Sequence, residues 1–252
     1  MSAVINNKVI LSIQNTDGLR WLKPEEIVVP LNDDAIKHIL SLCDAFWAYD
    51  YMYEGNPKKP HALLTSGKHS DGFVDVLRAL RFTNLCRIFA NQMVDKLNQF
   101  LLEQGHQDKK IAWVIGSDHA GATLSHTVAT ILNVQHDFTE KGPDKTQLWS
   151  RFPIGPDELV LQVEELIRTT STLEAVRRGI RQGNDPNRVQ FMPCVMTLVH
   201  RSPIYTFEDA PILHLLHLDI QVWDDKEHCP LCAAGSEALR PKHDWLKLTG
   251  KN

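Results

Sequence analysis

The stretch from Leu159 to Arg181 constrains the fold of this 252-residue chain more than any other part. It begins with a short apolar run, which is typical of a strand buried on both faces of a parallel sheet. Glu164 and Glu165 follow, and then come an arginine and four consecutive hydroxyl residues. From Leu173 onward the apolar residues recur at helical spacing. This order of strand, acidic pair, hydroxyl turn and helix predicts an anion site, because free N–H groups and the helix dipole favour a phosphate there.

The two carboxylates stand just before that turn, where they are placed to meet ribose hydroxyls or a Mg²⁺ ion that accompanies phosphates. The alternative for this stretch is an ordinary surface turn between a strand and a helix, with a Ser or Thr helix cap.

The segment from Val163 to Thr172 resembles the phosphoribosyl-pyrophosphate (PRPP) motif of type I phosphoribosyltransferases. That motif has a hydrophobic strand, two acidic residues, a branched apolar pair and a Thr/Gly/Ser loop. The resemblance implies that Glu164 and Glu165 hold the ribose, directly or through Mg²⁺. It also implies that the loop seats the 5′-phosphate, through Arg168, Thr169, Thr170, Ser171 and Thr172. Two departures are present: Thr170 and Ser171 replace small residues, often Gly, and Arg168 stands where Thr is common.

The segment from His61 to Val76 contains two strand-like pieces joined by Ser-Gly-Lys-His-Ser, which predicts a hairpin. It resembles the Ser-Gly-x-x-Ser segment of orotate phosphoribosyltransferases, which forms part of the substrate pocket. The resemblance implies that the base is bound by Ser66, Gly67, Lys68, Ser70 and Phe73. An aromatic face can stack on a flat base, and turn N–H and hydroxyl groups can bind its carbonyl or carboxylate oxygens. A surface hairpin without a ligand is the alternative.

An apolar strand from Ile111 to Gly116 is followed by a short turn and by a predicted helix from Ala122 to Leu132. Small residues in this turn permit close approach of the backbone to a ligand. The resemblance implies that the turn binds the pyrophosphate of PRPP, through Ser117, Asp118, His119, Ala120 and Gly121. The glycine spacing differs from the Gly-x-Gly-x-x-Gly of dinucleotide sites.

The segment from Val134 to Pro156 is rich in Gly, Pro and charge, which is typical of a functional lid inside a compact domain. In the resembled family a mobile loop here carries basic residues that close over the pyrophosphate. The resemblance implies that Lys141 is catalytic, with Lys145 and Arg151 as alternates. Glu140 precedes Lys141, whereas the family has an Arg-Lys pair. A solvated charged loop is the alternative.

A further buried strand is predicted from Phe191 to Leu198, and the resemblance places Arg201 near the base. There its guanidinium group could form a fork with an acidic substrate. The next predicted strand carries His214 and His217 among Leu residues, and we interpret both as packed side chains.

Cys229 and Cys232 form a Cys-x-x-Cys pair, which is typical of half a zinc site or of a redox pair. A complete zinc site would need His228, a histidine distant in the chain, or a partner subunit. We favour a reduced structural turn over a metal site. Some orotate phosphoribosyltransferase-like proteins have a similar Cys-Pro-x-Cys…Gly-Ser…Arg-Pro-Lys tail, so the resemblance covers roughly residues 60 to 242.

Composition narrows the class of protein. The chain is 43% hydrophobic and 23% charged, as globular proteins are. Its net charge of −4 argues against nucleic-acid binding, and no apolar run is long enough to cross a membrane. Residues 1–20 lack the apolar core of a secretory signal. Five cysteines, an odd number, suit the reducing cytoplasm better than a disulfide framework.

Alternating strands and helices predict an α/β fold, in which helices cover both faces of a parallel sheet and ligands bind at the carboxyl ends of its strands. We expect three segments: an N-terminal extension and helix (1–58), a phosphoribosyltransferase core (59–222), and a Cys-x-x-Cys tail packed on the core (223–252). Within the extension, Val9 to Ile13 is predicted to be a strand or an extended segment. A helix is predicted from Asp33 or Asp34 to about Tyr51.

The resemblance implies a homodimeric enzyme that transfers the ribose-5-phosphate of Mg²⁺-bound PRPP to a nitrogenous base, orotate or a related pyrimidine, and releases pyrophosphate. The departures in the phosphate loop and the lid favour an alternative on the same fold: a non-catalytic regulatory protein that binds PRPP or a nucleotide.

Overall fold

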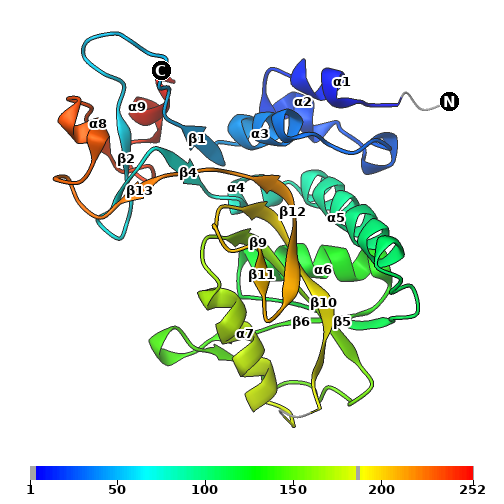
Figure 1. Ribbon diagram of the computed structural model, residues 1–252. Coiled ribbons are helices and arrows are strands. Elements are labelled where there is room, and N and C mark those ends of the chain that lie inside the picture. The colour runs from blue at the N-terminus through cyan, green and yellow to red at the C-terminus, as the bar shows by residue number, and fades with distance from the viewer. Residues whose placement is uncertain (1–3, 186–187, 252) are drawn as a thin grey trace.

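The computed structural model describes residues 4–185 and 188–251. Its main feature is a six-stranded sheet in the order β11-β12-β10-β9-β5-β6 (Figure 1). All pairs are parallel except β11 with β12, which is antiparallel. The strands are β5 (Ile111–Gly116), β6 (Gln135–Phe138), β9 (Leu159–Ile167), β10 (Gln190–His200), β11 (Thr206–Phe207) and β12 (Ala210–His217).

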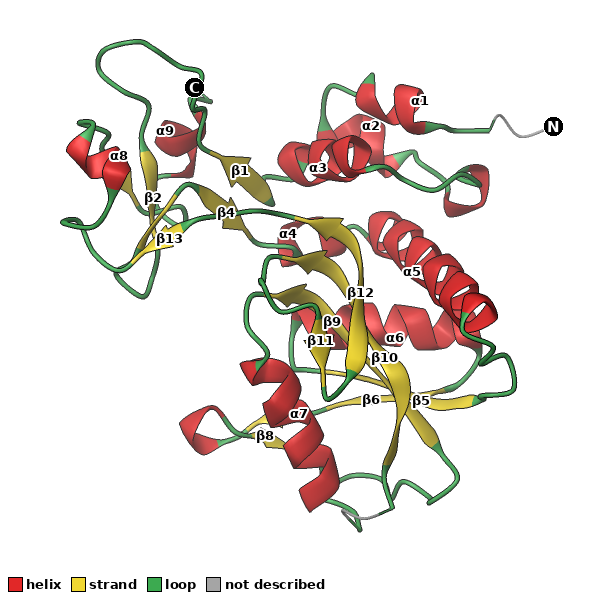
Figure 2. Ribbon diagram, in the orientation of Figure 1, coloured by secondary structure: helices red, strands yellow, loops and turns green. Residues whose placement is uncertain are grey.

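Helices cover both faces of this sheet, as the sequence predicts (Figure 2). On one face α5 (Thr83–Glu103) and α6 (Ala120–Leu132) pack against Val114, Leu161 and Val163. On the other face α7 (Ser171–Gln182) packs against Trp113, Ile115 and Val160. Because successive strand residues point to opposite faces, the apolar runs of β5 and β9 supply both cores at once. The α/β fold class is therefore confirmed.

The sheet has a topological switch point between β5 and β9. Taken in chain order, the parallel strands β5, β6, β9, β10 and β12 are the first to the fifth, and their spatial order is 2-1-3-4-5. In sheets of this order ligands bind beyond the carboxyl ends of the two strands where the order reverses. These two strands lead directly into the two loops that the sequence singles out as phosphate-binding.

The N-terminal segment differs from the prediction. It contains α1 (Asn7–Leu11), α2 (Thr16–Arg20), the short 3₁₀ helix η1 (Pro24–Glu26) and α3 (Asp33–Leu42). The extended segment predicted at Val9 is wrong, because the Asn6 side chain accepts hydrogen bonds from the N–H groups of Lys8 and Val9 and caps a helix.

The helix predicted to reach Tyr51 ends at Leu42, so that prediction is wrong beyond this point. Its cap is Asn32, whose side chain accepts from the N–H of Ala35. At Asp44 the backbone has a φ of 57°, which turns the chain out of the helix. The residues that follow form β1 (Phe46–Ala48), which pairs with β4 (Gly72–Val74).

A smaller sheet lies beside the main one, in the order β13-β3-β2-β14 (Figure 1). The predicted hairpin is present as β2 (His61–Leu63) and β3 (His69–Ser70). The other two strands are β13 (Val222–Trp223) and β14 (Ala238–Leu239), so the C-terminal segment shares a sheet with the hairpin. Two short helices, α8 (Pro230–Ala233) and α9 (Trp245–Thr249), complete this region, and α4 (Leu77–Leu80) leads from it to α5.

The segment predicted to be a lid forms a small hairpin after β6. Its strands are β7 (Glu140–Lys141) and β8 (Gln147–Leu148), joined by η2 (Pro143–Lys145). The hairpin lies against α7: a Cβ added at Gly179 would be 2.1 Å from the Gln147 carbonyl oxygen. None of the described helices combines the length and the apolar character that crossing a bilayer requires.

Candidate active site

The acidic pair at the end of β9 is largely buried. Glu164 is 2% exposed and Glu165 is half-buried. The Ser117 hydroxyl donates a 2.5 Å hydrogen bond to Oε2 of Glu164, whereas Oε1 has no partner among the described residues. Burial first, and then the charge of Glu165, raise the pKa of Glu164 to about 8, and burial also raises the pKa of Glu165. A buried carboxylate oxygen without a partner is costly, so this oxygen indicates a site for a proton, a hydroxyl or a cation.

The loop after β5 lies directly on this acidic pair. A Cβ added at Gly121 would be 2.7 Å from Oγ of Ser117 and 3.0 Å from Oε2 of Glu164. A Cβ at Gly116 would be 2.6 Å from the carbonyl oxygen of Gly121. Only glycine leaves room for these approaches. The two motifs, which are separate in the sequence, thus form one site across the switch point.

The N-terminus of α6 is open to an anion. His119 precedes the helix with a φ of 61° and a ψ of −110°, which non-glycine residues rarely adopt and which is found most often at functional sites. Its side chain is 85% exposed, 3.4 Å from the carboxylate of Asp118. Within the described chain no side chain caps this helix, so its first N–H groups remain available. Ala120, the first helical residue, is buried.

The N-terminus of α7 has the same character. Its hydroxyl side chains bond to one another or to Glu174: Oγ1 of Thr169 lies 2.8 Å from Oγ of Ser171, and Thr170 donates to Oε1 of Glu174. Among the described residues none caps the helix through its side chain. Arg168 and Thr172 are exposed beside it. Positive φ angles occur elsewhere in the described chain but not in 168–172, so this loop forms its turn without glycine.

Arg201 lies beside this loop, because its N–H donates a 2.9 Å hydrogen bond to the carbonyl of Ile167 at the end of β9. Burial first, and then the charge of Arg168, lower the pKa of Arg201 to about 10, while Asp71 acts in the opposite sense. Two guanidinium groups that repel one another favour an acidic ligand between them.

Most of the residues predicted to bind the base lie in the β2–β3 hairpin of the small sheet, whereas Phe73 lies on β4 and Arg201 follows β10. Ser70 is buried, and its one hydroxyl proton lies between the carbonyls of Gly72 and Gln221, with its oxygen 2.9 Å and 2.8 Å from them. Ser66, Gly67 and Lys68 lie exposed at the turn, where Lys68 pairs with Asp224 at 2.6 Å. Phe73 is half-buried, and its ring centroid is 5.9 Å from that of Trp245. Their role in binding a base stays a prediction.

Lys141 is exposed on the β7–β8 hairpin. Arg151 pairs with Asp137 at 3.0 Å and also with Glu140, so its charge is already matched. The side chain of Lys145 lies outside the described residues. Gln147 connects the hairpin to the loop after β5, because its amide donates to Oδ1 of Asp118 at 3.4 Å.

Two acidic residues of this site were missed by the sequence reasoning. The charge of Asp75, like that of Asp118, raises the pKa of Glu165, so Asp75 lies within electrostatic range of the acidic pair. Asp71 acts on Arg201 and is held by the Tyr51 hydroxyl at 2.7 Å and by the N–H of Gln221 at 2.8 Å. Their spacing of two residues on either side of Phe73, flanking β4, was an available signal, but only tertiary pairing brings them toward the end of β9.

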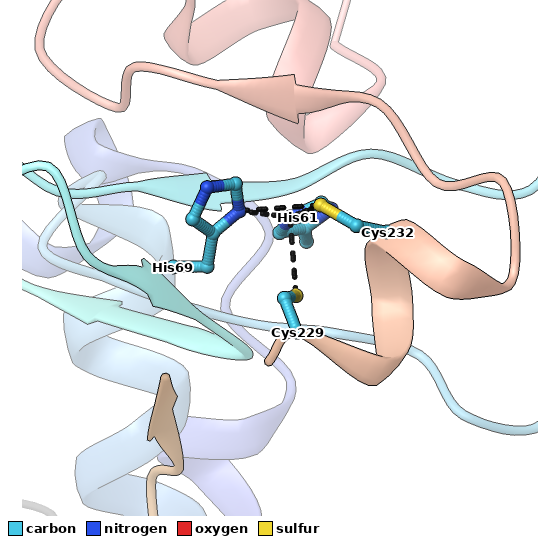
Figure 3. A group of neighbouring side chains, drawn as sticks. All are labelled: His61, His69, Cys229 and Cys232. Atoms are coloured by element: carbon cyan, nitrogen blue, oxygen red, sulfur yellow. Dashed lines mark hydrogen bonds between the residues drawn. The ribbon is translucent and has the colours of Figure 1, made fainter. Parts of the chain in front are cut away.

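Cys229 and Cys232 lie next to His61 and His69 of the hairpin (Figure 3). His228, which precedes Cys229 in the sequence, is not part of this group of ligand atoms. His228 is exposed and bonds to Asp225 at 2.8 Å. Of the ligands considered for completing the pair, the histidines distant in the chain are therefore the ones in place. His214 and His217 pack against the ring of His200, with centroids 5.2 Å and 5.3 Å from it.

Orotate phosphoribosyltransferases recur among the known proteins to which this chain is similar. No family model matches the chain. Over 184 residues it is 29% identical to the orotate phosphoribosyltransferase of Caldanaerobacter subterraneus subsp. tengcongensis, covering 73% of this chain and 88% of the relative. It is also 29% identical over 187 residues to the orotate phosphoribosyltransferase of Thermotoga maritima, covering 74% and 92%. Among solved structures, orotate phosphoribosyltransferase from Aeropyrum pernix aligns with a TM-score of 0.47 and 14% identity, covering 72% of this chain and 93% of that one.

Proposed function

We propose that this chain, a homologue of the orotate phosphoribosyltransferases, is an enzyme that transfers the ribose-5-phosphate of PRPP to a nitrogenous base and releases pyrophosphate. Two uncapped helix N-termini, which flank a buried acidic pair at the switch point of the sheet, carry this proposal. PRPP has two strongly anionic groups with a ribose between them, and this site offers two anion-binding ends with carboxylates between them.

The N-terminus of α7 would bind the 5′-phosphate, with Arg168 as an added cation. The N-terminus of α6, in the segment Ser117 to Gly121, would bind the pyrophosphate. Glu164 and Glu165 would accept hydrogen bonds from the ribose hydroxyls, which would give the unpaired Oε1 of Glu164 a partner.

The acidic groups also fit a magnesium ion, because Mg²⁺ prefers oxygen ligands and binds together with substrate phosphates. Glu165 lies in the field of Asp118 and Asp75, so several carboxylates converge here. When bound, the ion would neutralise charge on the departing pyrophosphate.

In the reaction, a ring nitrogen of the base bonds to the anomeric carbon and gives up its proton to water or to the departing pyrophosphate, while the bond from that carbon to pyrophosphate breaks with both electrons leaving on the pyrophosphate. The protein would contribute position and charge, not a covalent intermediate. We propose that Lys141 steadies the pyrophosphate when the β7–β8 hairpin closes and excludes water. The bond from Gln147 to Asp118 supports this, because it couples the hairpin to the pyrophosphate loop.

An acidic base, orotate or a related pyrimidine, fits the site best. Arg201 and Arg168 together would favour a carboxylate. Phe73 and the hairpin turn Ser66–Ser70 are the proposed contacts with the ring of the base. The five free cysteines suit a reducing compartment, and we propose a cytoplasmic location. The homodimer that the resemblance implies is a further proposal, which sedimentation velocity tests.

Titration calorimetry with PRPP and Mg²⁺, followed by a pyrophosphate-release assay over orotate and other bases, tests the function. We expect saturable PRPP binding and release that depends on the base, with both reduced in Glu165→Gln. Absence of PRPP binding would exclude the proposal. Binding without release for any base would instead favour the regulatory protein. The matched charge of Arg151 supports that second candidate, because it leaves the lid with fewer free cations.

A further inference from the structure

Four potential metal ligands converge beside the small sheet, at a place separate from the acidic pair of β9 (Figure 3). Ring nitrogens of His61 and His69 and the sulfur atoms of Cys229 and Cys232 all lie within 4.8 Å of one another. His61, His69 and Cys229 are 0%, 6% and 1% exposed, and Cys232 is half-buried. The ligands come from β2, from β3 and from the turn of α8, which are segments far apart in the sequence.

We propose that these four side chains bind a structural Zn²⁺ ion that joins the C-terminal segment to the β2–β3 hairpin. Two thiolates and two imidazoles are a preferred donor set for zinc, and four protein ligands leave no open position for catalysis. Magnesium and calcium are disfavoured because they take oxygen ligands.

The distances between ligand atoms agree with a tetrahedral site. The sulfur of Cys229 is 3.6 Å from Nε2 of His61, and the sulfur of Cys232 is 3.4 Å from both Nε2 of His61 and Nδ1 of His69. Zinc bonds of usual length would separate a sulfur and a nitrogen ligand by about 3.5 Å. The two histidine nitrogens are 2.8 Å apart, which is shorter than the separation of about 3.3 Å around zinc, so binding would move the rings slightly apart.

Neighbouring hydrogen bonds prepare His61 as a ligand. The Ser236 hydroxyl donates its proton to the carbonyl of Lys59 at 2.6 Å. Nδ1 of His61, 2.8 Å from the same oxygen, must therefore be the donor in that contact. Nδ1 thus carries the ring proton, and the unprotonated Nε2 is the atom that lies near the other three ligand atoms, the two sulfurs and Nδ1 of His69. Histidines that bind zinc usually donate such a hydrogen bond from the other ring nitrogen, which fixes the tautomer.

The backbone supports the same geometry. In the hairpin Leu63 pairs with His69, so His61 lies diagonally across from His69 on the same face of the sheet. Cys229 precedes Pro230 at the first turn of α8, and Gly235, with a φ of 81°, reverses the chain behind Cys232. The spacing of two residues between the cysteines is the one zinc sites use. A redox pair would need the two cysteines but would not explain two buried imidazoles pointing at them.

Metal analysis of the full-length protein, purified without added metal or chelator, tests the site. We expect one zinc per chain. After exchange, Co²⁺ should give the visible absorption of a tetrahedral site together with thiolate charge-transfer bands. Cys232→Ser and His69→Asn should lose the metal. His228→Asn and Cys86→Ser should keep it, because His228 is bonded to Asp225 and Cys86 lies on α5.

Because loss of a ligand could also unfold the chain, Cys232→His provides a second test. It retains four ligands but one thiolate, so it should bind Co²⁺ with about half the charge-transfer absorption. A wild-type protein that holds no zinc and gives no tetrahedral Co²⁺ spectrum would overturn the proposal. So would a His228→Asn variant that loses metal while His69→Asn keeps it. These measurements need no enzymatic activity and stand apart from the test of function.

Discussion

At the scale of single residues, Glu164 is a carboxyl group that the fold holds almost entirely out of water. Its raised pKa means that, in the folded protein without ligand, the carboxyl group keeps its proton to a higher pH than a carboxyl group in water does. The sign follows: the folded state binds the proton more tightly, so its stability is full below pH 4.5 and falls as the pH rises toward about 8. A partner for the carboxylate, such as a ribose hydroxyl or Mg²⁺, would remove this penalty.

Glu164→Gln should therefore stabilise the ligand-free protein at alkaline pH while it abolishes transfer. We expect the loss of unfolding free energy between pH 4.5 and about 8 to be smaller in the variant, by on the order of 3 kcal/mol. Urea unfolding across this range, for both proteins, measures the difference. Parallel curves for wild type and variant would contradict the assignment of a raised pKa to this residue.

Gly121→Ala should damage the site without a large effect on the fold. The new methyl group would meet Oγ of Ser117 at 2.7 Å and Oε2 of Glu164 at 3.0 Å, so the loop would move off the acidic pair. We expect at least a tenfold loss of PRPP affinity by calorimetry, roughly 1.4 kcal/mol. Gly155→Ala is the matched control, since its Cβ would make only ordinary contact, 3.4 Å from Glu158. Equal affinities in the two variants would show that the close approach is unimportant.

At the scale of elements, the uncapped N-terminus of α7 allows a substitution that should affect stability and PRPP binding in opposite directions. Thr170→Asp would place a carboxylate on the helix N-terminus, where caps and negative charge stabilise helices by about 1 kcal/mol. The same charge would occupy the proposed phosphate site. We therefore expect unchanged or higher thermal stability together with a loss of PRPP binding.

Thr170→Asn is the control for that experiment, because it caps the helix without charge. It should retain much more of the PRPP affinity than the Asp variant. If both variants bind PRPP as the wild type does, the phosphate does not bind at this helix.

His136 lies in β6, at the edge of the main sheet, and we expect its protonation to destabilise the fold at low pH. Burial first, and then the neighbouring His126, lower its pKa from 6.5 to about 4, and its Nε2 lies 2.9 Å from the Ser125 hydroxyl. The folded state disfavours the charged ring, so this contribution to stability is present above pH 6.5 and is lost as the pH falls toward 4. His136→Gln should reduce that loss by about 2 kcal/mol, measured by urea unfolding at both ends of the range. An equal loss in the variant would assign the acid sensitivity to other groups.

The elements that sequence reasoning identified correctly are those whose signal is local. The apolar runs of β5 and β9, each followed by a polar turn and a helical repeat, needed no knowledge of the rest of the chain. Val9 to Ile13 was too short for its period to decide between strand and helix, and the cap at Asn6 decided it.

The parts of the site that were missed depend on contacts between distant segments. Asp75 and Asp71 reach the acidic pair and Arg201 only because β4 pairs with β1 and the hairpin meets Gln221. His61 and His69 join the Cys-x-x-Cys turn only when β13 and β14 complete the small sheet. A single sequence contains no local pattern that indicates contacts between such distant segments.

At the scale of the whole molecule, the proposed function assigns different roles to the main sheet and to the small sheet. The N-termini of α6 and α7 lie at the carboxyl ends of β5 and β9 in the main sheet, so PRPP would bind at that edge of the main sheet. The hairpin proposed to contact the base belongs to the small sheet, and the proposed zinc ion joins this hairpin to the C-terminal segment. The other proposed contacts with the base, Phe73 on β4 and Arg201 after β10, lie outside that sheet. Metal and base are therefore expected to be coupled, whereas metal and PRPP are not.

Removal of zinc by a chelator should for this reason act unequally on the two substrates. We expect a lower thermal midpoint, faster amide hydrogen exchange in residues 61–74, and a KM for the base raised about tenfold. PRPP affinity by calorimetry should change by less than about twofold, because its proposed ligands lie on the main sheet. Added Zn²⁺ should restore each property, which separates metal loss from irreversible damage. An equal loss of affinity for both substrates would mean that the small sheet supports the entire active site and not the base pocket alone.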